Sequence, residues 1–296
     1  MSANVPDAAA AAAKKNGQAI LENTLTNLAH WARVIAVPPP WKMLQPHVPA
    51  VAAAIAAIAI IVIAMFAFDV PASAWVAHQE PQWLRDFFEK ITDLGLSGWF
   101  LFPLGFGLIA LAAIITPKLS MMSRGVLLAL AARFGFLFIA IGLPGLFGTI
   151  IKRLIGRARP FVGGFDNPFL YHPFVWRPAY ASLPSGHSTT AVAAAVAIGA
   201  VWPRSRRVMW VYACTIMASR VLVMAHHPSD VIAGALVGAV GALLLRRWFA
   251  AHRLVFCARD LRAYPGPSLR RIKAALHEVF SGRRPNYMNS LELSSD

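Results

Sequence analysis

The chain has 296 residues, of which 57% are hydrophobic and 14% are charged, and its formal net charge at pH 7 is +15. This composition, with a mean hydropathy of +0.56, is too apolar for an ordinary soluble domain. The positive charge does not indicate a nucleic-acid partner. Much of the excess lysine and arginine lies in the tails and in short connections beside apolar runs, as in membrane proteins.

Residues 1–47 precede the first long apolar run and form an N-terminal tail. Apolar and aromatic residues recur in this tail at helical spacing, which predicts an amphipathic helix. They are Ile20, Leu21, Leu25, Leu28, Trp31 and Ile35. Such a helix can lie on the inner leaflet of a membrane or pack against the cytoplasmic ends of membrane spans, and the periodicity leaves both interpretations open.

Apolar runs of roughly 20 residues, long enough to cross a bilayer core as helices, follow in residues 48–250. We therefore predict an all-α, polytopic membrane protein with a six-transmembrane-helix bundle. The expected spans are Val48–Phe68, Leu96–Ile115, Val126–Ile150, His187–Trp202, Val208–Ala225 and Val231–Phe249. A basic tail, residues 251–296, completes the chain and is expected to contact anionic lipid heads.

The distribution of lysine and arginine predicts the topology. Basic residues gather before span one, between spans two and three, between spans four and five, and after span six. These regions share one side of a six-span protein, so the positive-inside rule places both termini in the cytoplasm. No cleavable signal peptide is expected, because the first apolar run starts near residue 48. Residues 71–95, with Trp83 as an interfacial anchor, and residues 151–186 would then face outward.

The second outer loop breaks the positive-inside pattern. Among residues 151–186 the acidic side chain is Asp166, and the basic ones are Lys152, Arg153, Arg157, Arg159 and Arg177. Three short polar strings lie at the predicted outer ends of the spans. The first is Lys152, six residues, then Arg159-Pro160. The second is Pro184-Ser185-Gly186-His187. The third is Ser219-Arg220, five residues, His226, three residues, then Asp230.

The residue types in these strings suit an anionic phosphate. Arginine presents a planar fork that matches phosphate oxygens, and lysine supplies a compact charge, so Lys152, Arg159 and Arg220 can surround one phosphoryl group. Ser185 and Gly186 begin a predicted helix, whose free backbone N–H groups form an anion seat. Gly186 also lets the backbone approach the phosphate closely.

The histidines add a reactive group to this anion site. His226 and Asp230 are four residues apart, so in a helical turn they would share a face and Asp230 would orient the imidazole. The free ring nitrogen could then attack phosphorus as a nucleophile, and His187 could protonate the leaving oxygen. Arg157 and His227 adjoin the strings and are interpreted as bystanders. No cluster of carboxylates suggests a metal site.

The three strings resemble the signature motifs of the type 2 phosphatidic acid phosphatase superfamily, and every specified position matches in order and spacing. The resemblance covers roughly residues 96–249. It implies a six-helix membrane bundle and hydrolysis of a phosphoester without metal or cofactor. It further implies a phosphohistidine on His226, with His187 as acid and Asp230 as the orienting group. The implied phosphate contacts are Lys152, Arg159, Ser185, Gly186 and Arg220.

We therefore expect a lipid phosphatase at the outer face of a bacterial-type inner membrane. Its expected substrate is a prenyl pyrophosphate, phosphatidic acid, phosphatidylglycerol phosphate or the phosphate of lipid A, and the sequence does not select among them. One alternative is a phosphotransferase that uses the same site with an acceptor other than water. Another is a lipid-phosphate binder or transporter, although a transporter would more naturally place its polar groups near the membrane midplane.

Overall fold

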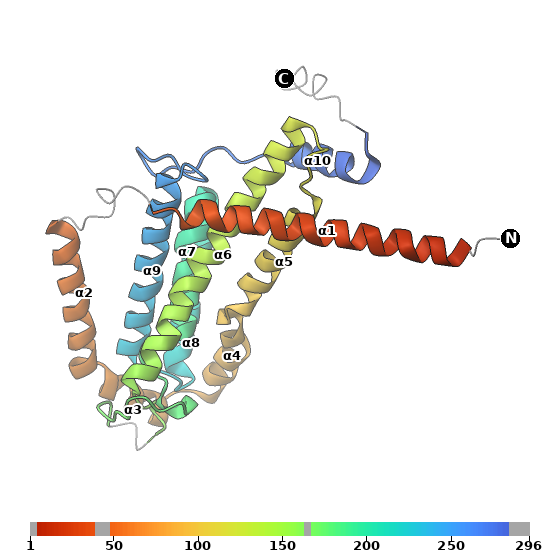
Figure 1. Ribbon diagram of the computed structural model, residues 1–296. Coiled ribbons are helices and arrows are strands. Elements are labelled where there is room, and N and C mark those ends of the chain that lie inside the picture. Colours follow the sequence, from red (N-terminus) through yellow and green to blue (C-terminus); the bar gives the residue numbers. More distant parts are fainter. Residues whose placement is uncertain (1–4, 39–47, 163–166, 284–296) are drawn as a thin grey trace. The chain divides into compact units, whose positions relative to one another are not determined.

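The computed structural model describes residues 5–38, 48–162 and 167–283 (Figure 1). Asp166, the far end of the C-terminal tail and the end of the N-terminal tail lie outside this part of the chain. Within it, the regular elements are helices, and backbone pairing is limited to isolated bridges. The longer helices are α1 (Val5–Ala36), α2 (Val48–Ala67), α3 (Asp69–His78), α4 (Gln82–Thr92), α5 (Gly98–Ile114), α6 (Met121–Ile155), α7 (Gly186–Val201), α8 (Arg206–Leu222), α9 (Pro228–Ala251) and α10 (Leu269–Ser281).

The chain forms two compact units. One comprises Met1–Pro38, Leu104–Gly135 and Tyr264–Asp296. The other comprises Pro39–Pro103 and Phe136–Ala263. Helices α5 and α6 each contribute to both units, and every residue of the three motif strings belongs to the second unit.

In the first unit, polar side chains satisfy the ends of two helices. Asn23 on α1 donates to the carbonyl oxygens of Ala112 and Ala113, at 3.1 and 3.0 Å, at the C-terminal end of α5 where carbonyls lack helical partners. Glu278 on α10 accepts from Ser120 and Ser123 at the start of α6, where a carboxylate also suits the helix dipole. These contacts attach α1 and α10 to the unit.

The predicted N-terminal helix is present as α1, but its apolar residues divide between two environments. Trp31 packs against the apolar cluster of the first unit. Ile20, Leu21 and Leu25 are 55–58% exposed. The helix therefore packs on its own unit through asparagines and Trp31, while it leaves an apolar stripe open.

In the second unit, α7 is the central helix and packs against α8 and α9, which lie beside it in Figure 1. Contact with α9 is close because glycine replaces a side chain at two points. A Cβ at Gly234 would lie 2.3 Å from the Ser185 carbonyl oxygen, and one at Gly238 would lie 2.4 Å from that of Thr189. The alanine-rich face of α7 fills the remaining space: Ala191, Ala193 and several neighbours are fully buried.

Each of the six predicted spans coincides with a helix, namely α2, α5, α6, α7, α8 and α9. By length and composition, three described helical stretches can cross a membrane: Gln82–Ile114, Met121–Ile155 and Pro228–Ala251. A fourth is added if α2 and α3, bent by 46°, form one span. The all-helical class and the membrane-spanning helices are confirmed. The number six stays a prediction, because α7 and α8, with 16 and 17 residues, are not among these stretches.

Candidate active site

The three motif strings meet at one end of the second unit, where α6 and α8 finish and α7 and α9 begin (Figure 1). Lys152 and Arg220 occupy the last turns of α6 and α8, and Ser185 is the N-cap of α7. Asp230 lies in the first turn of α9, which starts at Pro228 as expected for a proline at a helix N-terminus. Arg159 and His226 lie in the connections between helices.

The first turn of α7 forms the base of the site. The Ser185 N–H donates to the Asp230 carbonyl oxygen at 2.9 Å, which fixes α7 to the start of α9. A Cβ added at Gly186 would lie 3.1 Å from Nζ of Lys152, so the ammonium group lies over a residue without a side chain. A helix N-terminus and an ammonium group thus flank the same space, which is an arrangement for an anion.

Two guanidinium groups of the motifs carry unsatisfied donors. Nε of Arg159 and Nε of Arg220 are buried and have no hydrogen-bond partner within the described chain. Arg220 is held by its Nη1, which donates to Oγ1 of Thr92 at 2.5 Å. Burial lowers the pKa of Arg159, with Asp230 opposing the change and the charge of Arg153 adding to it. Buried cationic donors are costly unless an anion satisfies them, so both side chains have a free donor that an anion could accept.

His226 is buried, and a serine side chain connects it to Asp230. Its Nδ1 is 3.8 Å from Oδ2 of Asp230, which is too long for a hydrogen bond. Ser182 lies between them: its Oγ donates to Asp230 Oδ2 at 2.5 Å and lies 3.3 Å from His226 Nδ1. The direct hydrogen bond within one helical turn that we expected is therefore not formed, because His226 lies in a bend before α9 and the next residue, His227, has an extended backbone.

The protonation state of His226 suits a nucleophile. Burial lowers the pKa of His226 to about 4; the Asp230 carboxylate opposes this change, and the charges of Arg220 and Arg159 add to it. The imidazole is consequently neutral at neutral pH, the form in which a ring nitrogen has a free electron pair. Its backbone N–H donates to the Arg220 carbonyl oxygen at 3.0 Å, which ties the histidine to α8.

Arg157 is no bystander. Its side chain is fully buried, and its Nη1 donates to Asp230 Oδ1 at 2.6 Å while its Nη2 donates to Asp69 Oδ2 at 2.7 Å. Asp69, on α3, also accepts from the backbone N–H of Ser229 at 2.9 Å. The interpretation of Arg157 as an incidental neighbour is wrong, because this side chain neutralises two buried carboxylates.

His227 also has a structural role that its position beside the motif did not indicate. The ring Nδ1 lies 3.2 Å from Oγ of Ser73 on α3, and the backbone N–H donates to Asp230 Oδ2 at 3.0 Å. Sequence reasoning missed Ser73 and Ser182 entirely, since isolated serines carry no signal. Asp69 did carry a signal, because it is an acid at the end of an apolar span, where a charge is rare unless it has a partner.

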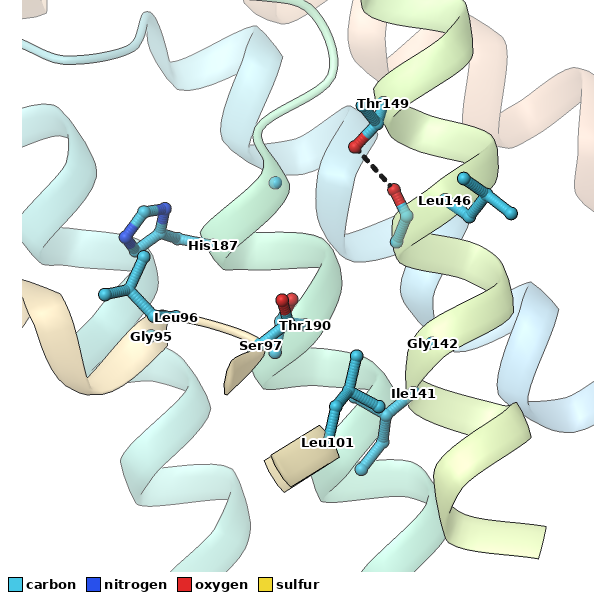
Figure 2. Close-up of a pocket in the computed structure, with 12 residues that line it drawn as sticks. Gly95, Leu96, Ser97, Leu101, Ile141, Gly142, Leu146, Thr149, His187 and Thr190 are labelled. Atoms are coloured by element: carbon cyan, nitrogen blue, oxygen red, sulfur yellow. Dashed lines mark hydrogen bonds between the residues drawn. The ribbon is translucent and has the colours of Figure 1, made fainter. Parts of the chain in front are cut away.

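His187 lines a cavity of about 360 Å³ next to the first turn of α7 (Figure 2). The other walls come from the residues that precede and begin α5, such as Gly95 and Leu101, and from Gly142 and Leu146 on α6. A second, more apolar groove of about 980 Å³ runs between α2, α6 and α9 and reaches Pro184, the residue before Ser185. Both spaces adjoin the motif residues, so a molecule with an apolar body can reach the site from either.

Comparison with known proteins identifies relatives of this chain. Residues 133–254 match the family model described as the PAP2 superfamily. Lipid A 1-phosphatase of Rhizobium johnstonii is 35% identical over 196 residues, which are 66% of this chain and 78% of the relative. Lipid A 1-phosphatase of Rhizobium etli is 33% identical, over 66% of this chain and 82% of the relative.

A further relative matches over a shorter part of the chain. Decaprenylphosphoryl-5-phosphoribose phosphatase of Mycobacterium tuberculosis is 37% identical over 97 residues, which are 32% of this chain and 50% of the relative. No solved structure matches the chain significantly.

Proposed function

The chain belongs to the PAP2 superfamily, and from this premise we propose that it removes a phosphate group from a lipid A-type glycolipid. The family and the two rhizobial relatives establish the broader activity: the protein is a membrane lipid phosphatase, a hydrolase of phosphoric esters. The observation that best supports catalysis, as opposed to lipid binding alone, is the neutral, buried His226 beside the buried donors of Arg159 and Arg220.

In the proposed reaction the phosphoryl group lies over the first turn of α7. Lys152, Arg159 and Arg220 neutralise its oxygens, and the free N–H groups of α7 donate to it. The free ring nitrogen of His226 attacks phosphorus while the bond from phosphorus to the lipid oxygen breaks. His187 transfers a proton to the departing oxygen, and a water molecule then hydrolyses the phosphohistidine to release inorganic phosphate.

Within this mechanism Asp230 acts through Ser182. The serine hydroxyl donates to the carboxylate and faces Nδ1 of His226, so the carboxylate both orients the ring and favours the positive charge that His226 gains on phosphorylation. No metal ion is required for these steps, because the cations of the protein itself supply the charge. The absence of a metal and of a cofactor is part of the proposal.

A prenyl phosphate is the second candidate substrate, and the mycobacterial relative favours it. Both cavities beside the site have apolar walls, so they fit either acyl or prenyl chains.

We further propose that the site faces the outer side of a bacterial inner membrane with both termini in the cytoplasm. The positions of lysine and arginine along the chain support this orientation.

The direct test is phosphate release from a panel of lipids by the purified protein in detergent. The panel contains lipid A phosphorylated at position 1 or at position 4′ alone, a prenyl diphosphate, phosphatidic acid and phosphatidylglycerol phosphate. We expect lipid A to be the best substrate and His226→Ala to abolish turnover. His30→Ala, which removes an exposed histidine of α1, is the matched control. Normal turnover by His226→Ala would refute the mechanism, and no release from any lipid would refute the function.

The same preparation tests the proposed chemistry. Turnover should persist in excess EDTA and be blocked by vanadate, because vanadate adopts the five-coordinate geometry of the transferring phosphoryl group. Loss of activity in EDTA that a divalent ion restores would show that the reaction depends on a metal.

A further inference from the structure

The turn between α4 and α5 contacts two residues of the candidate site, although it belongs to none of the three motif strings. Helix α4 ends at Thr92, and a short 3₁₀ turn, η2 (Asp93–Gly95), follows it. Thr92 and Gly95 are both buried. Helix α4 packs against α8 and η2 packs against α7, so the turn lies against the two helices that carry Arg220 and His187.

Thr92 holds one end of the Arg220 side chain. The threonine Oγ1 accepts from Nη1 of Arg220 at 2.5 Å and lies 3.0 Å from Oγ of Ser219. The Ser219 hydroxyl donates to the Ile216 carbonyl oxygen at 2.7 Å. The hydroxyl proton of Thr92 is therefore directed to Ser219, and its lone pair is left for the guanidinium. Ser219, a specified residue of the third motif string, thus fixes the direction of the Thr92 hydroxyl.

This contact restricts the plane of the Arg220 guanidinium. The group is flat, so a hydrogen bond at one nitrogen limits the directions in which the other nitrogens can donate. Nε of Arg220 is buried and has no hydrogen-bond partner among the residues that the structure describes. Thr92 therefore leaves this donor free for a phosphate oxygen and determines where it points.

Gly95 lies against the ring of His187 (Figure 2). A Cβ added at Gly95 would lie 2.8 Å from Cδ2 of His187 and 2.6 Å from Cγ2 of Ile216, so a side chain here would displace at least one of them. Gly95 does not have a positive φ. The close approach, and not the backbone conformation, therefore requires glycine at this position, and it determines how far the imidazole can turn toward α5.

Two further hydrogen bonds hold the turn in place. Oη of Tyr212 on α8 donates to the Leu94 carbonyl oxygen at 2.9 Å. Nε1 of Trp99 donates to the Asp93 carbonyl oxygen at 3.0 Å. The turn is thus fixed to α8 and to the start of α5, and the two site residues that it contacts keep a constant separation.

We propose that the turn from Thr92 to Gly95 positions two groups of the active site at once. Thr92 directs Nε of Arg220 to the transferring phosphoryl group, and Gly95 sets the ring of His187 beside the departing oxygen. The inference rests on the proposed function and adds two positioning residues to it. Their effects are separable, because Arg220 stabilises the phosphoryl group of every substrate, whereas a general acid matters most when the leaving group is poor.

The first test replaces Thr92 by valine, which has a similar shape without the hydroxyl. We expect Thr92→Val to lower kcat/KM about 10- to 100-fold, the effect of a misplaced group in an active site, for a lipid phosphate and for nitrophenyl phosphate alike. Vanadate should inhibit the variant more weakly by a similar factor, and this inhibition constant does not depend on the folded fraction of the protein.

Two variants complete the first test. Thr92→Ser keeps the hydroxyl and should behave like the wild type. Thr215→Val is the matched control, because it removes a threonine hydroxyl that donates to the Val211 carbonyl oxygen within α8. Unchanged inhibition of Thr92→Val by vanadate would overturn the role of Thr92.

The second test adds a methyl group at Gly95. Gly95→Ala should lower kcat for a lipid phosphate about tenfold or more and for nitrophenyl phosphate less than about threefold, with unchanged inhibition by vanadate. In the His187→Ala background it should cause no further loss, because residues that act as a unit are not additive. Gly125→Ala is the control, since a Cβ there would meet nothing within 4 Å. An equal loss in both backgrounds would overturn the role of Gly95.

Direct binding separates this inference from the proposed function. The dissociation constant of vanadate is measured by calorimetry for the wild type, Thr92→Val and Thr92→Ser, without any turnover. Weaker binding by the valine variant alone supports the inference. Equal binding by all three proteins, or binding by none, overturns it. Absence of phosphate release from every lipid by the wild type, by contrast, would refute the proposed function and leave this comparison valid.

Discussion

Nη1 of Arg157 lies 2.6 Å from Oδ1 of Asp230, and both side chains are completely buried. The other end of the guanidinium pairs with Asp69 at 2.7 Å, so one arginine joins α3 to the first turn of α9. Burial acts to lower the pKa of Arg157, but Asp230 and Asp69 outweigh it and raise the pKa above its ordinary value. The ionised carboxylate of Asp230 that orients Ser182 therefore depends on a residue at an unspecified position of the first motif string.

Replacement of Arg157 should destabilise the protein as well as inactivate it. Arg157→Gln leaves two buried carboxylates without a counter-charge, and removal of one partner from a buried ion pair costs about 3–5 kcal/mol. Arg157→Lys should rescue little, because an ammonium group cannot reach Asp69, Asp230 and the Pro168 carbonyl oxygen together. The measurement is the unfolding free energy of the detergent-solubilised protein, together with phosphate release.

Arg262 offers the matched control for this experiment. It pairs with Asp260 at 3.6 Å, and its side chain is 86% exposed. Exposed pairs contribute about 0–1 kcal/mol, so Arg262→Gln should leave both stability and activity near the wild-type values. A stability loss of the same size in both variants would mean that the buried network has no special importance.

Ser182→Ala should reduce turnover while the protein stays folded. The substitution removes the hydroxyl that lies between Asp230 and His226, so the carboxylate no longer fixes the imidazole. We expect kcat to fall about 10- to 100-fold with a smaller change in KM, because the phosphate-binding cations are untouched. Ser182→Thr keeps the hydroxyl and should retain more activity than Ser182→Ala. Equal activity of Ser182→Ala and the wild type would remove Ser182 from the mechanism.

The sequence predicts the helices of this protein well, because apolar runs and basic flanks are local properties. Each predicted span coincides with a helix, and the predicted amphipathic segment is part of α1. The apolar pattern does not show which face of α1 packs inward. The inward face carries Asn23 and Asn27, which donate to carbonyl oxygens within the last turn of α5 and just after it. Periodicity cannot reveal such a long-range contact.

The residues of the site also fall into a group that the sequence predicts and a group that it does not. The strings around Lys152, Ser185 and His226 are visible because several chemistry-bearing residues occur at short spacing. The residues that support them are not. Arg157 looked like one basic residue among several in its loop, and Ser182 like any serine. Their importance comes from contacts over 73 and 48 positions of sequence with Asp230, which only the fold establishes.

The pH profile should report the ionisation of His226. Because burial lowers the pKa of His226 to about 4, we expect this residue to limit kcat/KM only below about pH 4, well under the ordinary value near 6.5. Arg159→Gln removes a charge that lowers this pKa, so the acidic limb should move to higher pH. Ionisation of the free substrate is common to both profiles, so their difference reports ionisable groups of the enzyme. An acidic limb at the same pH in both proteins would contradict the assignment.

The stability of the protein should also depend on pH, because His226 has a lower pKa in the folded protein than in the unfolded chain. Between pH 6.5 and about 4, the unfolded chain binds a proton at His226 and the folded protein does not. The contribution of His226 to the free energy of unfolding therefore decreases as the pH falls through this window. His226→Asn cannot bind that proton, so its loss of stability between pH 6.5 and 4 should be smaller than that of the wild type.

Single cysteines should establish the orientation in the membrane. On a background without Cys214 and Cys257, cysteines at positions Ser2, Asn167 and Ser294 are treated with an impermeant thiol reagent in intact cells. Asn167 is exposed in the loop of the site, and we expect it alone to react if both termini are cytoplasmic. Permeabilised cells, in which all three should react, provide the control. Labelling at either terminus in intact cells would place the site on the opposite side.

The role proposed for His187 predicts a dependence on the leaving group. A general acid contributes most when the departing oxygen is a strong base and little when the oxygen is already a stable anion. His187→Ala should therefore lower kcat for a lipid phosphate about 100-fold or more and for nitrophenyl phosphate less than about tenfold. The comparison within one variant cancels any general loss of folding, because misfolded protein would lower both rates by the same factor. His187 lines the cavity between the start of α5 and α6 (Figure 2), so the leaving group should lie on that side. If the two rates fall equally, His187 only helps to hold the phosphoryl group, and the proton must come from water.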